Sequence, residues 1–127
     1  MIFAAMIEDR HSADLVVLRI KTQTWRLLTE ADELIRQDGE VVEVTRNGRR
    51  RFRVGQTYAV QPGRGKRSIG RIRLLWIIHR KPFDLRMDDL LAEGFTNGHA
   101  FYEAIENYYG PDARFMQGVS LVFELVE

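Results

Sequence analysis

The 127-residue sequence contains no cysteine and only three prolines, and no apolar run approaches the roughly 20 residues that a membrane-spanning helix needs. Without cysteine there is no disulfide framework, no thiolate zinc site and no cysteine nucleophile. The first acidic residue, Glu8, comes too early for the apolar region of a secretory signal peptide. We therefore expect a cytoplasmic protein that does not bind membranes.

Motifs for catalysis or metal binding are also scarce. His11, His79 and His99 are widely spaced and have no companion ligands in register, so we expect no metal and no other cofactor. No GxSxG, HExxH or paired-carboxylate pattern occurs in the sequence. What the chain does contain is the composition of a soluble globule, with 45% apolar and 29% charged residues. Its length suits one domain, which we assign to residues 1–127.

Acidic side chains are absent from one long stretch, residues 44–83, which carries twelve basic ones. The segments on either side are acidic, since residues 1–43 hold nine acids against five bases. We interpret the middle stretch as a surface that meets an anion, with RNA as the expected partner. The alternative is that these arginines form ion pairs with the acidic segments across the fold.

The pattern of apolar residues and turn residues predicts a mixture of strands and short helices. We expect strands at residues 1–7, 40–46, 49–54, 57–60, 68–79 and 118–126, an extended or looped segment at 21–28, and helices at 11–19, 29–36, 88–93 and 98–109. The sum is an α+β fold, a small β-barrel of five to six strands with a few short helices as covers.

Several of these predictions rest on single residues. Asn47 and Gly48 are a strong signal for a hairpin turn, and Ser12 suits the N-cap of the first helix. Thr29, followed by acidic residues, favours a helix up to residue 36. Phe101, Ile105 and Tyr108 recur at helical spacing and are expected in the core. Trp76, inside the run LLWII, is expected to be buried because that run is apolar on both faces.

Four segments together resemble a known family. Residues 21–26 (KTQTWR) resemble the lysine-threonine-x-threonine-x-arginine signature of the ASCH domain, a relative of the PUA RNA-binding fold. Residues 54–58 are similar to that family's glycine turn before a central strand, and residues 61–72 to a version found among its phage and bacterial members. Residues 91–95 resemble its EGF element.

The resemblance implies a PUA-like β-barrel with a cleft lined by the signature residues. Such domains are generally thought to bind RNA or nucleotide-like ligands. Some members are hydrolytic: one branch deacylates N-acetylated cytidine, and a few are reported as ribonucleases. The amidohydrolase branch relies on a lysine, a threonine and a glutamate on the central strand.

Within the signature, Lys21, Thr24 and Arg26 are the candidate binding residues. Lysine offers a point charge for phosphate, arginine a two-pronged donor, and threonine a hydroxyl. In a flat strand, residues 21 and 24 would lie on opposite faces, so a cleft that uses both requires a turn. Trp25 is a further candidate, as a ring on which a base could stack.

The second group of candidates lies in residues 61–73. Glycines in the loop QPGRG expose backbone amides to an anion, and the nearby cations Arg64, Lys66, Arg67 and Arg71 would hold phosphates. Arg73 falls where we align the glutamate of the amidohydrolase branch. A cation there removes the base of the reaction, and only Glu93, from another loop, could replace it.

Three hypotheses follow. The first is a non-catalytic domain that binds RNA, another single-stranded nucleic acid or a nucleotide-like small molecule in a cationic cleft. The second is a ribonuclease or N-acetylcytidine amidohydrolase that uses Lys21 and Thr24. The third is a regulatory module that binds an acidic protein partner. The sequence does not determine the oligomeric state.

Overall fold

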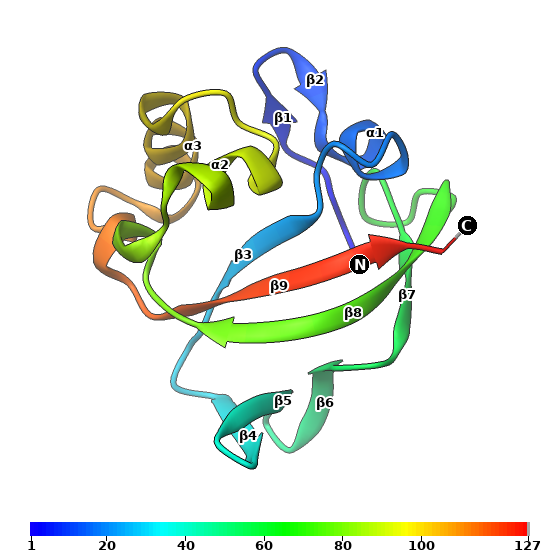
Figure 1. The fold of residues 1–127 in the computed structure, drawn as a ribbon, viewed down its shortest axis with the longest axis vertical. Helices are drawn as coiled ribbons and strands as arrows, with labels where there is room; N and C mark the ends of the chain where they lie inside the picture. The colour runs from blue at the N-terminus through cyan, green and yellow to red at the C-terminus, as the bar shows by residue number, and fades with distance from the viewer. Residues whose placement is uncertain (127) are drawn as a thin grey trace.

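The computed structural model describes residues 1–126, which form one sheet with helices at one end (Figure 1). The strands of this sheet are β3 (Gln23–Leu27), β4 (Asp32–Gln37), β5 (Glu40–Arg46), β6 (Arg49–Arg53), β7 (Thr57–Val60), β8 (Gly70–His79) and β9 (Gly118–Leu125). They pair in the order β3-β9-β8-β5-β4, with β6 also on β5 and β7 also on β8, and every pair is antiparallel. The predicted mixture of helices and strands is therefore confirmed.

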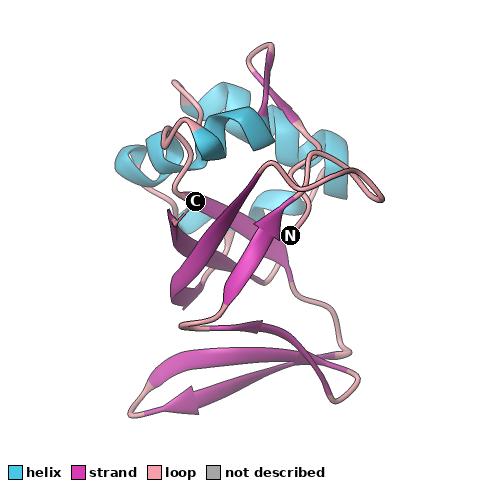
Figure 2. Ribbon diagram, turned by 90° about the vertical axis from the view of Figure 1, so that its right-hand side faces the viewer, coloured by secondary structure: helices cyan, strands magenta, loops and turns pink. Residues whose placement is uncertain are grey.

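The predicted barrel of five to six strands is not confirmed. Over residues 1–126 the sheet has seven strands, and its end strands β3 and β4 are not joined to each other. One residue pair, Val41 with Ile77, links β5 to β8. The β4–β6 strands therefore form a separate layer that crosses below the rest of the sheet (Figure 2).

Three helices lie at the opposite end from β4–β6 (Figures 1 and 2). They are α1 (Ser12–Val17), α2 (Met87–Glu93) and α3 (Gly98–Tyr109), and two 3-10 turns, η1 (Pro82–Asp84) and η2 (Ala113–Phe115), connect them to the sheet. Two short strands, β1 (Met6–Ile7) and β2 (Arg10–His11), form a hairpin beside α1. No helix within residues 1–126 combines the length and the apolar character needed to span a membrane.

Two of the helix details differ from expectation. His11, not Ser12, caps α1, because its Nδ1 atom accepts a hydrogen bond from the Ala13 amide. Phe101 and Ile105 of α3 are buried as expected, but Tyr108 is 77% exposed. Tyr108 lies in the last turn of α3, where Tyr109, and not Tyr108, packs against the core.

The helix predicted for residues 29–36 is wrong. Thr29 donates two hydrogen bonds to Asp32, from its amide and its hydroxyl, but these close a turn instead of starting a helix. The chain then continues as β4 and reverses at Asp38 and Gly39, which both adopt positive φ angles (54° and 83°). This is the backbone of a two-residue hairpin turn, and Asn47 and Gly48 form the predicted second one.

The prediction that Trp76 is buried is also wrong. The pairing of β8 with β9 shifts register between Leu74 and Trp76, so Leu75 is an extra residue, a β-bulge. Leu74 and Ile77 are buried, whereas Trp76 is 56% exposed. Without the bulge, Trp76 would share the inward face with Leu74, because side chains in a regular strand alternate.

Candidate ligand-binding site

Lys21 and Glu93 form a buried ion pair between the start of β3 and the end of α2. The ammonium group of Lys21 donates a hydrogen bond to the Glu93 backbone carbonyl at 2.7 Å and lies 3.7 Å from Glu93 Oε1. Each side chain is 5% exposed. Gly94 ends α2 with a φ of 100° and passes close to Lys21, since a Cβ there would lie 3.7 Å from the lysine Cβ. Glycine at this position therefore lets the helix end directly over the lysine.

The pair lies along the free edge of β3. One edge of this strand bonds to β9, and on the other the Trp25 amide donates to Glu93 Oε1 at 3.2 Å. The Thr22 amide donates to the Ala92 carbonyl at 2.8 Å. The end of α2 thus closes an edge that would otherwise leave backbone groups unpaired.

Arg26, Gln23 and Thr24 of β3 extend this site. Arg26 donates from Nη2 to the Ile2 carbonyl at 2.7 Å, and its guanidinium lies 5.4 Å from the centre of the Phe3 ring. Gln23 and Thr24 are buried, with 4% and 7% of their surface exposed. We call Lys21, Gln23, Thr24, Arg26 and Glu93 the buried polar cluster. The strand is regular from residue 23 to 27, so Thr24 and Arg26 share one face and Lys21 precedes the strand.

Three buried atoms of the cluster have no hydrogen-bond partner within residues 1–126. They are Glu93 Oε2, an acceptor, and Gln23 Nε2 and Arg26 Nε, which are donors. Most buried polar atoms in folded proteins are paired, because an unpaired one costs about 1–3 kcal/mol. The Gln23 side chain nevertheless favours the charged forms of Glu93 and Asp89 through hydrogen bonding. The free capacity of the cluster is therefore one acceptor, Glu93 Oε2, and one donor, Arg26 Nε.

Burial perturbs the ionisation of the central pair. It lowers the pKa of Lys21, and the nearby Glu93 carboxylate opposes this only in part. It raises the pKa of Glu93, although Lys21, the Trp25 amide and Arg26 favour the charged form. Burial likewise raises the pKa of Tyr109, which neighbours Arg26. Burial thus shifts the pKa of each member of the pair in the direction that favours its neutral form, because burial penalises charge.

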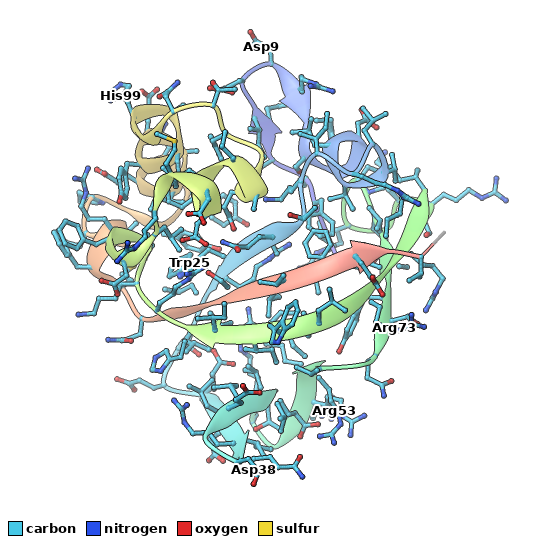
Figure 3. All side chains as sticks on the ribbon, viewed as in Figure 1. Asp9, Trp25, Asp38, Arg53, Arg73 and His99 are labelled. Atoms are coloured by element: carbon cyan, nitrogen blue, oxygen red, sulfur yellow. The ribbon has the colours of Figure 1, made fainter. Side chains whose placement is uncertain are left out.

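Trp25 is packed tightly at this site. The indole is 4% exposed, its Nε1 donates to the Arg80 carbonyl at 2.9 Å, and its ring lies 5.6 Å from that of Tyr109 (Figure 3). A Cβ on Gly118 would come within 2.1 Å of the indole, so glycine is required there. A base cannot stack on Trp25 in this arrangement.

The other predicted residues lie at the surface. Arg64, Lys66 and Arg67 are exposed, and none of them forms an ion pair with any residue in the range 1–126. Arg71 donates to the Thr57 hydroxyl at 2.8 Å. Arg73 lies 3.7 Å from Glu124 of β9, with about half of each side chain exposed. The carboxylate that meets Lys21 is therefore Glu93 from α2, and Arg73 does not occupy that place.

Four of the five arginines of the β5–β6 hairpin are paired with carboxylates, as the alternative interpretation of the basic stretch proposed. Arg46 binds Asp32 through two hydrogen bonds of 2.9 Å, and Arg51 lies 3.4 Å from the same carboxylate. Glu43 pairs with Arg50 at 2.7 Å and with Arg53, labelled in Figure 3, at 3.3 Å. The fifth, Arg49, is exposed and forms no ion pair within residues 1–126.

Sequence reasoning gave Glu93 only a conditional role, and it missed Asp32. The signal for Glu93 was present, since it lies in the segment that resembles the EGF element, but its separation of 72 positions from Lys21 in the sequence hid the pairing. Among residues 1–126 no group of three His, Asp or Glu side chains is placed to hold a metal ion.

Comparison with family models finds no match, and no curated protein matches the sequence. Solved structures do match. The crystal structure of an ASCH domain from Lactobacillus crispatus JV V101 is similar with a TM-score of 0.63 and 20% identity, over 91% of this chain and 70% of that one. A DUF984 protein from Enterococcus faecalis V583 is similar with a TM-score of 0.61 and 20% identity, over 90% and 66%.

Proposed function

Because the chain has the ASCH-domain fold, we propose that it binds single-stranded RNA or a nucleotide-like ligand. In this proposal the buried polar cluster recognises a base or a sugar, with Lys21, Thr24 and Arg26 as its contacts. The loop at residues 61–67 holds phosphate. The domain acts by binding, without a chemical step.

The observation that carries the proposal is the incompletely paired charge inside the cluster. A buried ion pair is rarely the most stable way to fill a protein interior, because removing two charges from water costs several kcal/mol. Here the pair is buried, and Glu93 Oε2 and Arg26 Nε have no partner among residues 1–126. A site with a free donor and a free acceptor suits the edge of a base, which presents both kinds of group.

Access to the cluster requires a local movement. Thr24 and Lys21 expose only 7% and 4% of their surface, and the Ile2 carbonyl occupies Arg26 Nη2. A ligand carbonyl or phosphate oxygen can replace the Ile2 carbonyl as the acceptor for Arg26. In this account the segment before β1 moves aside when the ligand binds.

The loop supplies the phosphate contacts in this account. The Lys66 amide donates to the Gly63 carbonyl at 3.1 Å, and Gly65 has a φ of 72°, so the loop tip is a tight turn that presents its side chains to solvent. Because Arg64, Lys66 and Arg67 are exposed and unpaired, they can meet an anion without breaking an existing ion pair. The paired arginines of the hairpin would have to give up an ion pair to bind an anion.

Binding of a fluorescein-labelled oligouridylate of about 12 nucleotides at low salt tests the phosphate contacts. The triple substitution Arg64→Gln, Lys66→Gln and Arg67→Gln should weaken binding about tenfold or more, because three phosphate contacts are lost. The matched control removes three exposed charges elsewhere, through Arg10→Gln, Arg49→Gln and Arg86→Gln. No binding by the wild type, or equal losses in the two triple variants, would contradict the proposal.

Thr24 offers a sharper test of the cluster. Thr24→Val removes only the hydroxyl, and the exposed Thr22→Val is its neighbour and control. If the hydroxyl contacts the ligand, only the first variant should bind more weakly, by about 1 kcal/mol or more. An equal affinity in both variants would exclude Thr24 from the site.

The position of Glu93 favours a second candidate function, hydrolysis of an acylated nucleoside. Glu93 stands 3.7 Å from Lys21 and has a raised pKa, so it suits a general base. It would take a proton from water as the oxygen attacks the amide carbon, and return it to the amine when the C–N bond breaks. Turnover of N-acetylcytidine that is lost in both Lys21→Ala and Glu93→Gln would establish this function, and absence of turnover in the wild type would exclude it.

A further inference from the structure

Trp76 is a large aromatic side chain that the bulge in β8 turns outwards. The extra residue, Leu75, places Trp76 on the outer face, while Leu74 and Ile77 on either side remain buried. Bulges often re-aim a side chain at a functional site. An indole that is 56% exposed gains little from packing, so its outward direction requires another explanation.

The indole borders a groove of about 570 Å³ between β8 and the β4–β6 layer. The groove forms where β5 meets β8 through the single pair Val41 and Ile77. Val42 and Val54 line one side, and Trp76 and Ile78 line the other. These four side chains give the groove an apolar part beside the indole.

Two arginines lie near the indole. Arg36 lines the groove, together with His79 and one carboxylate, Glu40. Arg36 has no ion pair within the described part of the chain, residues 1–126. Arg73 lies on the same strand, on the other side of the bulge, 3.7 Å from Glu124 and with 47% of its side chain exposed, so a phosphate there would compete with that carboxylate. Beyond Arg73 the chain connects to the loop at residues 61–67.

We propose that this face of β8 is a second contact surface for single-stranded RNA, with Trp76 as a stacking platform and Arg36 and Arg73 as phosphate contacts. The proposal rests on the proposed function, because it takes RNA as the partner. Surfaces that bind single strands combine an aromatic ring with flanking cations in this way. A second copy of the chain is the competing occupant, because Trp and Arg are also enriched in protein–protein interfaces, and the sedimentation measurement below distinguishes the two.

The fluorescence of the wild-type protein gives a direct test. Trp25 is 4% exposed and Trp76 is 56% exposed, so a stacked base reaches only Trp76. Adding oligouridylate should quench the emission of the exposed tryptophan and protect it from quenching by acrylamide. A duplex RNA of equal length should do so much less, because its bases are already stacked. RNA binding without any change in this emission would overturn the inference.

Affinity measurements on three variants complete the test. Trp76→Ala should weaken oligouridylate binding about tenfold, the order of one lost stacked base, and Trp76→Phe should retain most of the affinity. Phe83→Ala is the matched control, because Phe83 is an equally exposed aromatic residue (59%) outside the groove.

The outcomes separate this inference from the function on which it rests. If RNA binds and the loop variants weaken it but Trp76→Ala does not, the inference fails and the proposed function stands. If the wild type binds no RNA, both fail. If Trp76→Ala instead abolishes a dimer seen by sedimentation, the occupant is a second copy and the inference is overturned.

Discussion

Two buried carboxylates, one in each half of the molecule, differ in how completely they are paired. Asp32, in the β4–β6 layer, is 1% exposed and accepts hydrogen bonds from Thr29, Arg46 and Arg51. Burial opposes its ionisation, but these bonds and charges outweigh it and lower the pKa of Asp32. Glu93, beside β3, is 5% exposed, has one oxygen without a partner and has a raised pKa.

The difference separates a structural ion pair from a candidate binding site. Asp32 forms ion pairs with Arg46 and Arg51. From the sequence alone, both arginines belong to the basic stretch that we interpreted as a surface for an anion. Glu93 Oε2 is buried without a hydrogen-bond partner among residues 1–126, which costs free energy of folding. The same contrast distinguishes the hairpin arginines from the loop cations, since a charge already paired within the fold contributes less to binding an anion.

The largest effect is expected at the Lys21–Glu93 pair. Lys21→Met alone should destabilise the fold by about 3–5 kcal/mol, because it leaves a buried carboxylate without its charge partner. Combining it with Glu93→Gln should recover most of this loss, since Gln still accepts from the Trp25 amide. Urea unfolding at pH 7 measures both variants. A double variant as unstable as Lys21→Met would show that the pair itself stabilises the fold.

The pH dependence of the Lys21→Met variant sharpens this prediction. The pKa of Glu93 is raised by burial, so the folded state binds its proton more tightly than the unfolded state. The stability from this group is complete below the unfolded pKa of about 4.5 and is lost as the pH rises through the folded value. The deficit of Lys21→Met should therefore shrink towards acid pH. A deficit that is constant with pH would contradict the assignment.

A smaller loss, about 2 kcal/mol, is expected for Asp32→Asn, which weakens hydrogen bonds to two charged groups. Here the sign is opposite, because the pKa of Asp32 is lowered. Its contribution is present above the unfolded value of 3.8 and disappears as the pH falls through the folded value. The acid side of the stability curve should be flatter in Asp32→Asn than in the wild type. Parallel curves would show that another carboxylate is responsible.

The pair of Arg50 and Glu43 should contribute less than the Lys21–Glu93 pair or Asp32, because Arg50 is exposed although Glu43 is buried. The Arg50 side chain is 54% exposed, so Arg50→Gln should cost about 0.2–1 kcal/mol. High salt should reduce even this loss in urea unfolding. A loss of stability as large as that of Asp32→Asn would show that the ion pair of Glu43 contributes as much as those of Asp32.

The smallest effect on stability is expected in the loop. Arg64→Gln, Lys66→Gln and Arg67→Gln together should change the free energy of unfolding by less than about 0.5 kcal/mol, because these residues are exposed and unpaired among residues 1–126. Thermal unfolding beside the control triple at Arg10, Arg49 and Arg86 checks this. A large loss would mean that the loop cations support the fold.

Local signals predicted much of the fold. Asn47 and Gly48 marked a hairpin, and alternation marked β5, β6 and β9, because each depends on neighbours in the chain. The failures came from tertiary contacts. Thr29 and the acids after it have the composition of a helix start, yet pairing with β5 made this segment a strand. A single extra residue at Leu75 reversed the direction of Trp76, and alternation cannot predict a bulge.

The candidate site was predictable only in part. The signature motif identified Lys21, Thr24 and Arg26, but not the carboxylate that meets the lysine, because Glu93 lies 72 residues away in the sequence. The charge pattern identified a basic stretch without showing which arginines already had partners. The partners of these arginines are Asp32 and Glu43. Both lie before the basic stretch in the sequence, Glu43 directly beside its first residue.

The salt dependence of oligouridylate binding tests the central claim most directly, that the loop cations hold phosphate and exposed cations elsewhere do not. Each phosphate contact to a single strand contributes about 0.7 to the slope of log K against log salt concentration. The loop triple should lower the magnitude of the slope by about 2, and the control triple should leave it unchanged. A loop triple with the slope of the wild type would contradict the account.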